Sequence, residues 1–212
     1  MGKPYSKSGG LKPELWTERS VDETQQMYDD WASSYDADVD TRGYRTPGRI
    51  AKALAAALPE DERPVLDYGC GTGLGGAALR AAGIDTVHGT DINQAMLDEA
   101  HPKGIYRKLW LGTPGTPPAP PGIYRAIVAT GVISLGAAPP EALVQLVDAL
   151  AEGDLLALSF NDPTLAHGGF DAILQAECDS GRLSVVSRAH GPHLDDVGMG
   201  SDVIVARRGP AP

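Results

Sequence analysis

The segment VLDYGCGTGL, residues 65–74, constrains the fold more than any other part of this 212-residue chain. The apolar run after Pro64 is typical of a buried strand, which Pro64 can precede without removing a needed backbone donor. Gly69, Gly71 and Gly73 then allow backbone conformations that other residues resist, and they let a ligand approach the main chain closely. The pattern predicts a strand, a glycine turn and a helix whose free N–H groups face a ligand.

A second acidic residue follows at the end of the next apolar run. Residues 86–92 (TVHGTDI) predict a short strand, and Asp91 lies at its end. A carboxylate at this position is well placed to bind both ribose hydroxyls of an adenosine. Gly71-x-Gly73-x-x-Gly76 also fits the dinucleotide fingerprint. The glycines and Asp91 therefore do not by themselves separate a nicotinamide or flavin enzyme from a methyltransferase.

Four motifs make that distinction by resemblance. Asp67-x-Gly69-x-Gly71-x-Gly73 resembles motif I of the class I S-adenosylmethionine-dependent methyltransferases, and DINQAML (residues 91–97) resembles the acidic motif that follows it. YDDWASSYD (residues 28–36) resembles the N-terminal helix that often precedes motif I in small-molecule methyltransferases. GIYRKL (residues 104–109) is similar to the group that includes the methyltransferase-like protein of the Williams–Beuren syndrome region. The resemblance covers residues 25–160.

The resemblance implies an S-adenosylmethionine site, with S-adenosylhomocysteine as the product. Asp67 would orient the ammonium group, Gly69 and its neighbours would hold the methionine moiety, and Asp91 would take the ribose hydroxyls. Ile92 and Met96 would flank the adenine, while Tyr28, Trp31 and Tyr35 would form a lid. The expected cofactor-binding residues are Tyr28, Trp31, Tyr35, Asp67, Gly69, Cys70, Gly71, Thr72, Gly73, Asp91, Ile92, Met96, Thr113, Thr130, Gly131 and Val132.

The chain departs from the family pattern in two places. Gly112-Thr113 stands where many relatives carry Gly-Asp, so a hydroxyl would accept the adenine bond more weakly than a carboxylate. Tyr124-Arg125 stands where relatives often have Tyr-Asp, which we interpret as a surface change.

The acceptor is poorly defined by the sequence. No Asn-Pro-Pro-Tyr-type motif follows the fourth expected strand, and Asn161-Asp162-Pro163 after the fifth is interpreted as a turn. His167 is the best candidate for a catalytic base. His190 and His193 lie near two acidic residues, but loop histidines without a third spaced ligand do not predict a metal site.

Strands that alternate with helices predict an α/β fold: a Rossmann-like, doubly wound, seven-stranded, mostly parallel sheet with an antiparallel edge strand and helices on both faces. The proline-rich segment 112–122 must be a surface loop. We expect residues 1–40 to form an N-terminal tail and lid helix, beginning near Val21, and residues 41–212 to form the methyltransferase domain. The expected strands are 64–68, 86–90, 105–111, 126–130, 155–160, 183–189 and 201–207, and the expected helices after the first are 48–58, 74–82, 93–101, 139–151 and 170–179.

The composition limits which kinds of partner the protein is expected to bind. A net charge of −10 disfavours nucleic acid, and Arg42, Arg45 and Arg49 are interpreted as solvated charges rather than a basic patch. Two cysteines predict no disulfide framework, so we expect a cytoplasmic protein. No apolar run is long enough to span a bilayer, so no membrane partner is expected. We expect a monomer or a homodimer.

The primary hypothesis is therefore a methyltransferase that acts on an N, O or S nucleophile of a small molecule. A nicotinamide-dependent oxidoreductase is disfavoured, because the chain has no Tyr-x-x-x-Lys pair in the expected place and no length for a second domain. Two alternatives stay open: a non-catalytic S-adenosylmethionine-binding regulator and a protein methyltransferase.

Overall fold

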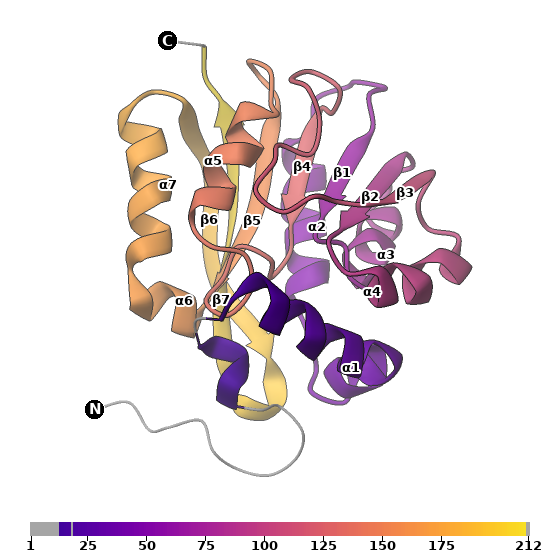
Figure 1. Cartoon of the computed structure of the whole chain (residues 1–212). Coiled ribbons are helices and arrows are strands. Elements are labelled where there is room, and N and C mark those ends of the chain that lie inside the picture. The colour runs from indigo at the N-terminus through magenta and orange to yellow at the C-terminus, as the bar shows by residue number, and fades with distance from the viewer. Residues whose placement is uncertain (1–12, 18, 211–212) are drawn as a thin grey trace.

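A seven-stranded sheet in the order β3-β2-β1-β4-β5-β7-β6 forms the centre of the molecule (Figure 1). The computed structural model describes residues 13–17 and 19–210. Neighbouring strands run parallel from β3 to β5, and β7 is antiparallel to both β5 and β6. The strands are β1 (Val65–Tyr68), β2 (Val87–Asp91), β3 (Lys108–Leu111), β4 (Ala126–Ala129), β5 (Leu155–Asn161), β6 (Leu183–Leu194) and β7 (Met199–Arg208). The predicted fold class is confirmed.

Both faces of the central strands are buried. On β4, Ala126 and Val128 belong to one hydrophobic cluster, whereas Ile127 and Ala129 belong to the cluster on the opposite face. This burial on both faces explains why the central strands read as continuous apolar runs rather than as alternating ones.

Helices cover the two faces. Side chains of α2 and α3 pack in one cluster, and those of α5 and α7 pack in the other. Helix α1 lies across the carboxyl end of the sheet, at the lower end of the view in Figure 1. The helices are α1 (Val21–Asp40), α2 (Thr46–Ala57), α3 (Leu74–Ala81), α4 (Gln94–Ala100), α5 (Glu141–Asp148), α6 (Asp162–His167) and α7 (Gly169–Asp179), with short 3-10 turns at η1 (Pro13–Trp16), η2 (His101–Lys103) and η3 (Asp195–Val197).

The start of α1 follows the sequence prediction. Ser20 caps the helix by accepting from the backbone N–H of Glu23, and the Glu23 carboxylate accepts from the backbone N–H of Ser20. This is the reciprocal capping box expected from Ser-x-x-Glu.

One helix was not predicted. The segment after β5 was expected to be a turn, but Asn161 caps α6 by accepting from the backbone N–H of Thr164 at 3.1 Å. Pro163 lies in the first turn of this helix, where its missing N–H costs nothing. The turn signal at Asn-Asp-Pro was therefore a helix-start signal.

The environment of two histidines was also predicted wrongly. β6 continues to Leu194, so His190 and His193 lie on a strand and not in a loop. Tyr124 is buried, with 4% of its surface exposed, and its hydroxyl lies 3.2 Å from Nδ1 of His88. The family pattern also has tyrosine at this position, so the departure is at Arg125, which is half-buried and donates from Nη1 to the carbonyl of Asp61. Smaller differences concern element ends, such as the start of β3 at Lys108.

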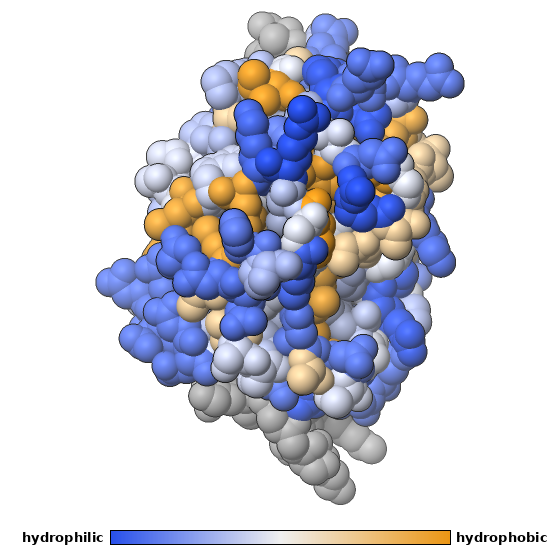
Figure 2. Space-filling model, turned by 90° about the vertical axis from the view of Figure 1, so that its right-hand side faces the viewer, coloured by the Kyte–Doolittle hydropathy of each residue, from blue (hydrophilic) through white to orange (hydrophobic). Residues whose placement is uncertain are grey.

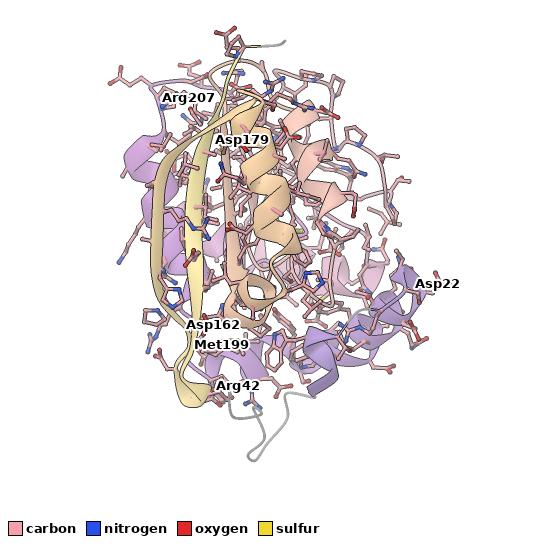
Figure 3. The ribbon with its side chains drawn as sticks, turned by 90° about the vertical axis from the view of Figure 1, so that its left-hand side faces the viewer. Asp22, Arg42, Asp162, Asp179, Met199 and Arg207 are labelled. Carbon is pink, nitrogen blue, oxygen red and sulfur yellow. The ribbon has the colours of Figure 1, made fainter. Side chains whose placement is uncertain are left out.

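The molecular surface is mostly polar where it can be viewed. On the face shown in Figure 2, hydrophobic residues form several areas separated by hydrophilic side chains. Figure 3 shows the opposite side, with Asp162 and Met199 close together near the tip of the β6–β7 hairpin and Asp22 at the start of α1. Within the described residues, none of the helices combines the length and the apolar character that crossing a membrane requires.

Candidate functional site

A cavity of about 940 Å³ lies at the carboxyl ends of the parallel strands. Its wall includes the turn after β1, the end of β2, the segment after β4 and the inner side of α1. Open α/β sheets bind ligands in this position, at the point where the strand order reverses. β1 lies between β2 and β4, so the reversal falls at the glycine turn.

The glycine turn requires glycine for two different reasons. Gly69 has φ +65°, and a Cβ built on it would lie 2.4 Å from a methyl carbon of Val132. Gly71 has φ +52°, but a Cβ there would meet no atom within 4 Å among the described residues. Gly71 lines the cavity, so its missing side chain leaves room for a ligand against the main chain.

Replacing Gly69 with Ala should destabilise the protein strongly. The methyl group would clash with Val132 and would hold alanine in a left-handed conformation, which together should cost about 2–4 kcal/mol. Thermal and urea unfolding would measure the change. Gly115→Ala is a matched control, because Gly115 also has a positive φ but has no atom within 4 Å of the added Cβ. Equal destabilisation of both variants would contradict the role of the Val132 contact.

Asp91 presents an oriented carboxylate to the cavity. Its Oδ2 accepts from the backbone N–H of Gly71 at 2.8 Å, and its Oδ1 accepts from that of Asn93 at 2.9 Å. Burial raises the pKa of this carboxyl above its usual value, while the backbone N–H groups oppose that rise. Each oxygen keeps a lone pair for a ligand hydroxyl, which is the arrangement that two ribose hydroxyls require.

Asp67 occupies a different position. It is 1% exposed, and its Oδ2 accepts from the hydroxyl of Tyr106 at 2.7 Å. Burial raises the pKa of Asp67 to about 7, with the bonds from Tyr106 and from the backbone of Gly76 acting in the opposite direction. Asp67 therefore joins β1 to the start of α3 and does not line the cavity wall.

Helix α1 is fastened to the end of β2 near the cavity. Gln25 donates from Nε2 to the carbonyl of Ile92 at 2.9 Å, and Asn93 donates from Nδ2 to the carbonyl of Gln25 at 3.0 Å. The same Asn93 group also donates to Asp29 at 2.8 Å. Asn93 also caps α4 by accepting from the backbone N–H of Met96, so one buried side chain joins α1 to α4.

A second fastening lies farther along α1. The Asp36 carboxylate accepts from the Thr72 hydroxyl in the glycine turn and forms an ion pair with Lys103 of η2. Lys103 Nζ also donates to the carbonyl of Thr72 at 2.7 Å. These three residues connect α1 to the glycine turn.

Breaking the Asp36 contacts should loosen the lid more than the fold. The Asp36–Lys103 pair is partly exposed, so Asp36→Asn should change the free energy of unfolding by less than about 1 kcal/mol. The dissociation rate of a bound S-adenosylhomocysteine should rise about threefold to tenfold, measured by stopped-flow displacement. Asp40→Asn, at an exposed position on the same helix, is the control. An unchanged dissociation rate would contradict a role for Asp36 in holding the lid.

Most of the predicted site residues line the cavity. These are Tyr28, Tyr35, Gly69, Gly71, Asp91, Ile92, Met96, Thr113, Thr130, Gly131, Val132 and the candidate base His167. The structure places Trp31, Asp67, Cys70, Thr72 and Gly73 outside that wall. Cys70 is buried, and burial raises the pKa of its thiol, which fits a space-filling role.

Two buried hydroxyl oxygens fit the presence of a polar ligand. Among the described residues, Oγ1 of Thr90 and Oγ1 of Thr130 are buried without a hydrogen-bond partner, and both residues line the cavity. A buried hydroxyl without a partner is costly, so a ligand that bonds to it gains affinity.

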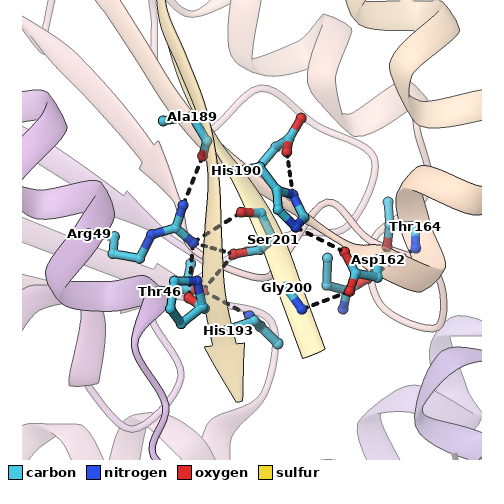
Figure 4. Close-up of polar contacts among 12 residues, drawn as sticks. Thr46, Arg49, Asp162, Thr164, Ala189, His190, His193, Gly200 and Ser201 are labelled. Carbon is cyan, nitrogen blue, oxygen red and sulfur yellow. Dashed lines mark hydrogen bonds and ion pairs between the residues drawn. The ribbon is translucent and has the colours of Figure 1, made fainter. Parts of the chain in front are cut away.

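The three arginines that were considered as a basic patch all make structural contacts. Arg42 pairs with Asp196 at 2.9 Å and Arg45 with Asp195 at 2.6 Å. Arg49 donates to backbone carbonyls of the β6–β7 hairpin and to the hydroxyl of Ser201 (Figure 4). These residues hold α2 and its entry against the hairpin, so they do not form a free basic surface.

The histidines of β6 also have structural partners. His193 Nδ1 lies 2.8 Å from the Thr46 hydroxyl, and burial lowers the pKa of His193 to about 4. His190 Nδ1 lies 2.8 Å from Asp202 (Figure 4). In the part of the chain that the structure describes, no three His, Cys, Asp or Glu side chains gather as a metal site.

Several residues of the site were not predicted from the sequence. Tyr106 was quoted only within a motif, although it bonds to Asp67, and Gln25 and Lys103 were not considered. The cavity wall from Leu135 to Ala142 was also missed. Its sequence has no regular period and no charged pair, so only the three-dimensional structure brings it to the site. For Tyr106, the available signal was a lone tyrosine directly before a strand.

Comparison with known proteins identifies the family. Residues 42–193 match the family model described as "Methyltransferase domain", so the chain belongs to this methyltransferase family. Human methyltransferase-like protein 27 is 41% identical over 124 residues, which cover 57% of this chain and 51% of that protein. The chain thus aligns with only about half the length of this curated relative. These matches confirm the resemblance to class I methyltransferases.

Solved structures share the fold. Magnesium protoporphyrin IX methyltransferase from Synechocystis PCC 6803, solved with bound SAM, superposes with a TM-score of 0.66 at 20% identity, covering 91% of this chain and 100% of that one. The [4+2]-cyclase SpnF gives 0.68 at 17% identity, covering 92% and 98%. Geranyl diphosphate C-methyltransferase from Streptomyces coelicolor A3(2) gives 0.61 at 14% identity, covering 88% and 97%. At these identities, the likeness concerns the fold.

Proposed function

We propose that the protein is a methyltransferase that transfers the methyl group of S-adenosylmethionine to a small-molecule acceptor with an N, O or S nucleophile. The observation that carries the proposal is the Asp91 carboxylate, oriented by two backbone N–H groups at the wall of a 940 Å³ cavity beside an open Gly71. Residues 41–212 are proposed as the catalytic domain, and the preceding α1 is proposed as its lid.

The cofactor would bind along the carboxyl ends of β2, β1 and β4. Asp91 would hold the ribose hydroxyls, Ile92 and Met96 would flank the adenine, and Thr113 would face its amino group. Gly69, Thr130 and Gly131 would hold the methionine moiety. Asp67 would act on its ammonium group indirectly, because its carboxylate is held by Tyr106 behind the wall. When bound, the cofactor supplies an activated methyl group on a positively charged sulfur.

A small molecule is favoured over nucleic acid on electrostatic grounds. The chain carries a net charge of −10, and Arg42, Arg45 and Arg49 are paired or bonded to backbone groups. Phosphate backbones are repelled by such a surface. The cavity volume also lies in the range that suits small-molecule ligands.

His167 is proposed as the group that accepts a proton from the acceptor. It ends α6, lines the cavity and is exposed, and its Nδ1 accepts from the backbone N–H of Gly169 at 3.3 Å. His167→Ala should lower kcat about 100-fold to 10,000-fold and leave the affinity for S-adenosylhomocysteine unchanged. A kcat within twofold of the wild type would remove His167 from the mechanism.

Turnover decides between an enzyme and a binding protein. The protein would be incubated with S-adenosylmethionine and matched sets of amine, thiol and hydroxyl acceptors, and the release of S-adenosylhomocysteine would be measured. Acceptor-dependent release that disappears in Asp91→Ala supports the proposal. Tight cofactor binding with no release above the acceptor-free rate would favour the non-catalytic S-adenosylmethionine-binding regulator. The fold alone does not decide this, because one fold can support different chemistries.

A further inference from the structure

A small cavity adjoins the large one at the ends of β4 and β5. It measures about 80 Å³, and five aromatic side chains form much of its wall: Trp16, Tyr28, Trp31, Tyr35 and Tyr44. We call it the aromatic chamber. Tyr28, Tyr35 and Gly131 line both cavities, so the two spaces lie side by side. Trp31 and Tyr44 line only the chamber.

The chamber lies at the reacting end of the proposed cofactor site. Gly131 follows β4 and Asn161 ends β5, and both line the chamber. Asp91, which would hold the ribose, ends β2 on the other side of β1 and does not line it. A group in the chamber would therefore contact the methionine end of the cofactor, not its adenine end. This placement rests on the proposed function.

The aromatic rings pack closely around the chamber. The ring centres of Trp31 and Tyr35 are 4.7 Å apart in an edge-to-face arrangement, and those of Tyr28 and Trp31 are 6.2 Å apart. Tyr44 packs edge-on against His193 at 5.2 Å. Trp31 is further fixed by a 2.7 Å bond from its Nε1 to Asp38. The rings are held in place before any ligand arrives.

The chamber wall is uncharged at neutral pH. No Asp, Glu, Lys or Arg is among the described residues that line it. Burial raises the pKa of Tyr28, Tyr35 and Tyr44, and burial lowers the pKa of His193 to about 4, so all four stay neutral. An anion would find no partner in this space, whereas the faces of aromatic rings attract cations.

The surroundings have the complementary charge. Helix α1, which supplies three of the five rings, has an acidic sequence with no Lys or Arg. Its charged residues are Asp22, Glu23, Asp29, Asp30, Asp36, Asp38 and Asp40. Negative charge beside an entrance raises the local concentration of cations and speeds their association.

We propose that the methyl acceptor is an amine whose nitrogen enters the aromatic chamber, while its apolar body lies in the large cavity against Leu135, Pro139 and Phe170. An amine is a cation on approach and gives up a proton to water or to His167 before it reacts. Its lone pair then forms the N–CH₃ bond as the S–CH₃ bond breaks, and that electron pair stays on sulfur. The positive charge passes from sulfur to nitrogen, so the rings face a cation before and after transfer. The new ammonium group finally releases a proton to water.

A matched ligand pair tests the chamber directly. Choline and 3,3-dimethylbutan-1-ol have the same shape, but only choline carries a charge. Each would be titrated into the protein saturated with S-adenosylhomocysteine, and binding would be followed by NMR shifts. Choline should bind between about 2-fold and about 30-fold more tightly than its neutral counterpart, the range that one cation–π contact supplies.

Two pairs of variants assign the preference to the rings. Tyr44→Leu and Trp31→Leu should reduce the choline preference toward one, whereas Tyr44→Phe and Trp31→Phe should keep most of it. Because neither residue lines the large cavity, all four variants should bind S-adenosylhomocysteine within about threefold of the wild type.

The outcomes separate this inference from the proposed function. Failure of the wild-type protein to bind S-adenosylhomocysteine would overturn the proposed function. Normal binding with no preference for choline, or a preference that survives both leucine variants, would overturn the amine assignment and leave the proposed function standing.

Discussion

Asp91→Ala should raise the dissociation constant for S-adenosylmethionine about 100-fold to 1,000-fold while the protein stays folded. The carboxylate would accept bonds from two ribose hydroxyls, and each such charge-assisted bond contributes about 1.5–3 kcal/mol. Losing both, with partial replacement by water, corresponds to about 3–4 kcal/mol, which gives the stated range. Calorimetric titration of the purified variant measures the effect.

Two controls separate ligand contact from local structure. Asp91 also accepts from the backbone of Gly71 and Asn93, so Asp91→Asn should keep part of the turn and show a smaller loss, about 10-fold. Asp85→Ala, at an exposed position outside the site, should bind normally. Circular dichroism and thermal unfolding would verify that each variant is folded. A dissociation constant for Asp91→Ala within threefold of the wild type would contradict the site assignment.

The free energy of unfolding of the wild type should fall between about pH 4 and pH 7, and Asp67→Asn should abolish that fall. The folded pKa of Asp67 is raised to about 7 by burial, above the unfolded value of about 3.9. Because the folded pKa is raised, the protonated Asp67 carboxyl contributes its full stabilisation below the unfolded pKa. This contribution is lost as the pH rises through the folded pKa. Integrated over that interval, the loss is about 4 kcal/mol as an upper bound.

Asparagine keeps the shape and the acceptor oxygen. Its Oδ1 can still accept from Tyr106 and from the backbone of Gly76, but the side chain has no charge to desolvate. Urea unfolding at pH 4, 5.5 and 7 would compare the two proteins, with Asp85→Asn as the exposed control. The difference between wild type and Asp67→Asn should grow with pH. Parallel curves for the two proteins would contradict the raised pKa.

The fold was predictable because local signals agreed with the long-range arrangement. Apolar runs such as residues 126–129 are continuous since both faces of their strands are buried, and glycine or proline marks the ends of several elements. Asn161 shows where this reasoning fails. The same residues, Asn-Asp-Pro, begin either a turn or a helix, and the choice depends on packing that a local sequence does not contain.

The candidate site was predictable only where one motif carries it. Gly69, Gly71 and Asp91 lie within short segments next to strands whose ends must meet, so their proximity follows from the topology. Asp67 occupies the first position of the same motif but lies behind the wall, because the alternation of β1 directs it toward Gly75 and Tyr106. The contacts of Asp36 with Thr72 and Lys103 join three distant segments, which no local pattern encodes.

The aromatic chamber illustrates the same limit. The resemblance predicted that Tyr28, Trp31 and Tyr35 act together on the first helix, and their rings do lie together there. The second wall of the aromatic chamber is formed by Tyr44 and by residues that follow β4 and end β5. These residues are far apart in the chain. The sequence indicated an aromatic lid. It did not indicate that the rings border an uncharged space beside the proposed cofactor site, because that arrangement depends on the tertiary structure.

Parallel calorimetric titration with S-adenosylmethionine, S-adenosylhomocysteine and NAD tests the central claim most directly. The geometry of Asp91, Gly71 and the cavity predicts micromolar binding of both adenosyl ligands and no detectable binding of NAD. Binding of NAD alone would mean that the glycine turn serves a dinucleotide, and it would contradict the proposed methyltransferase site.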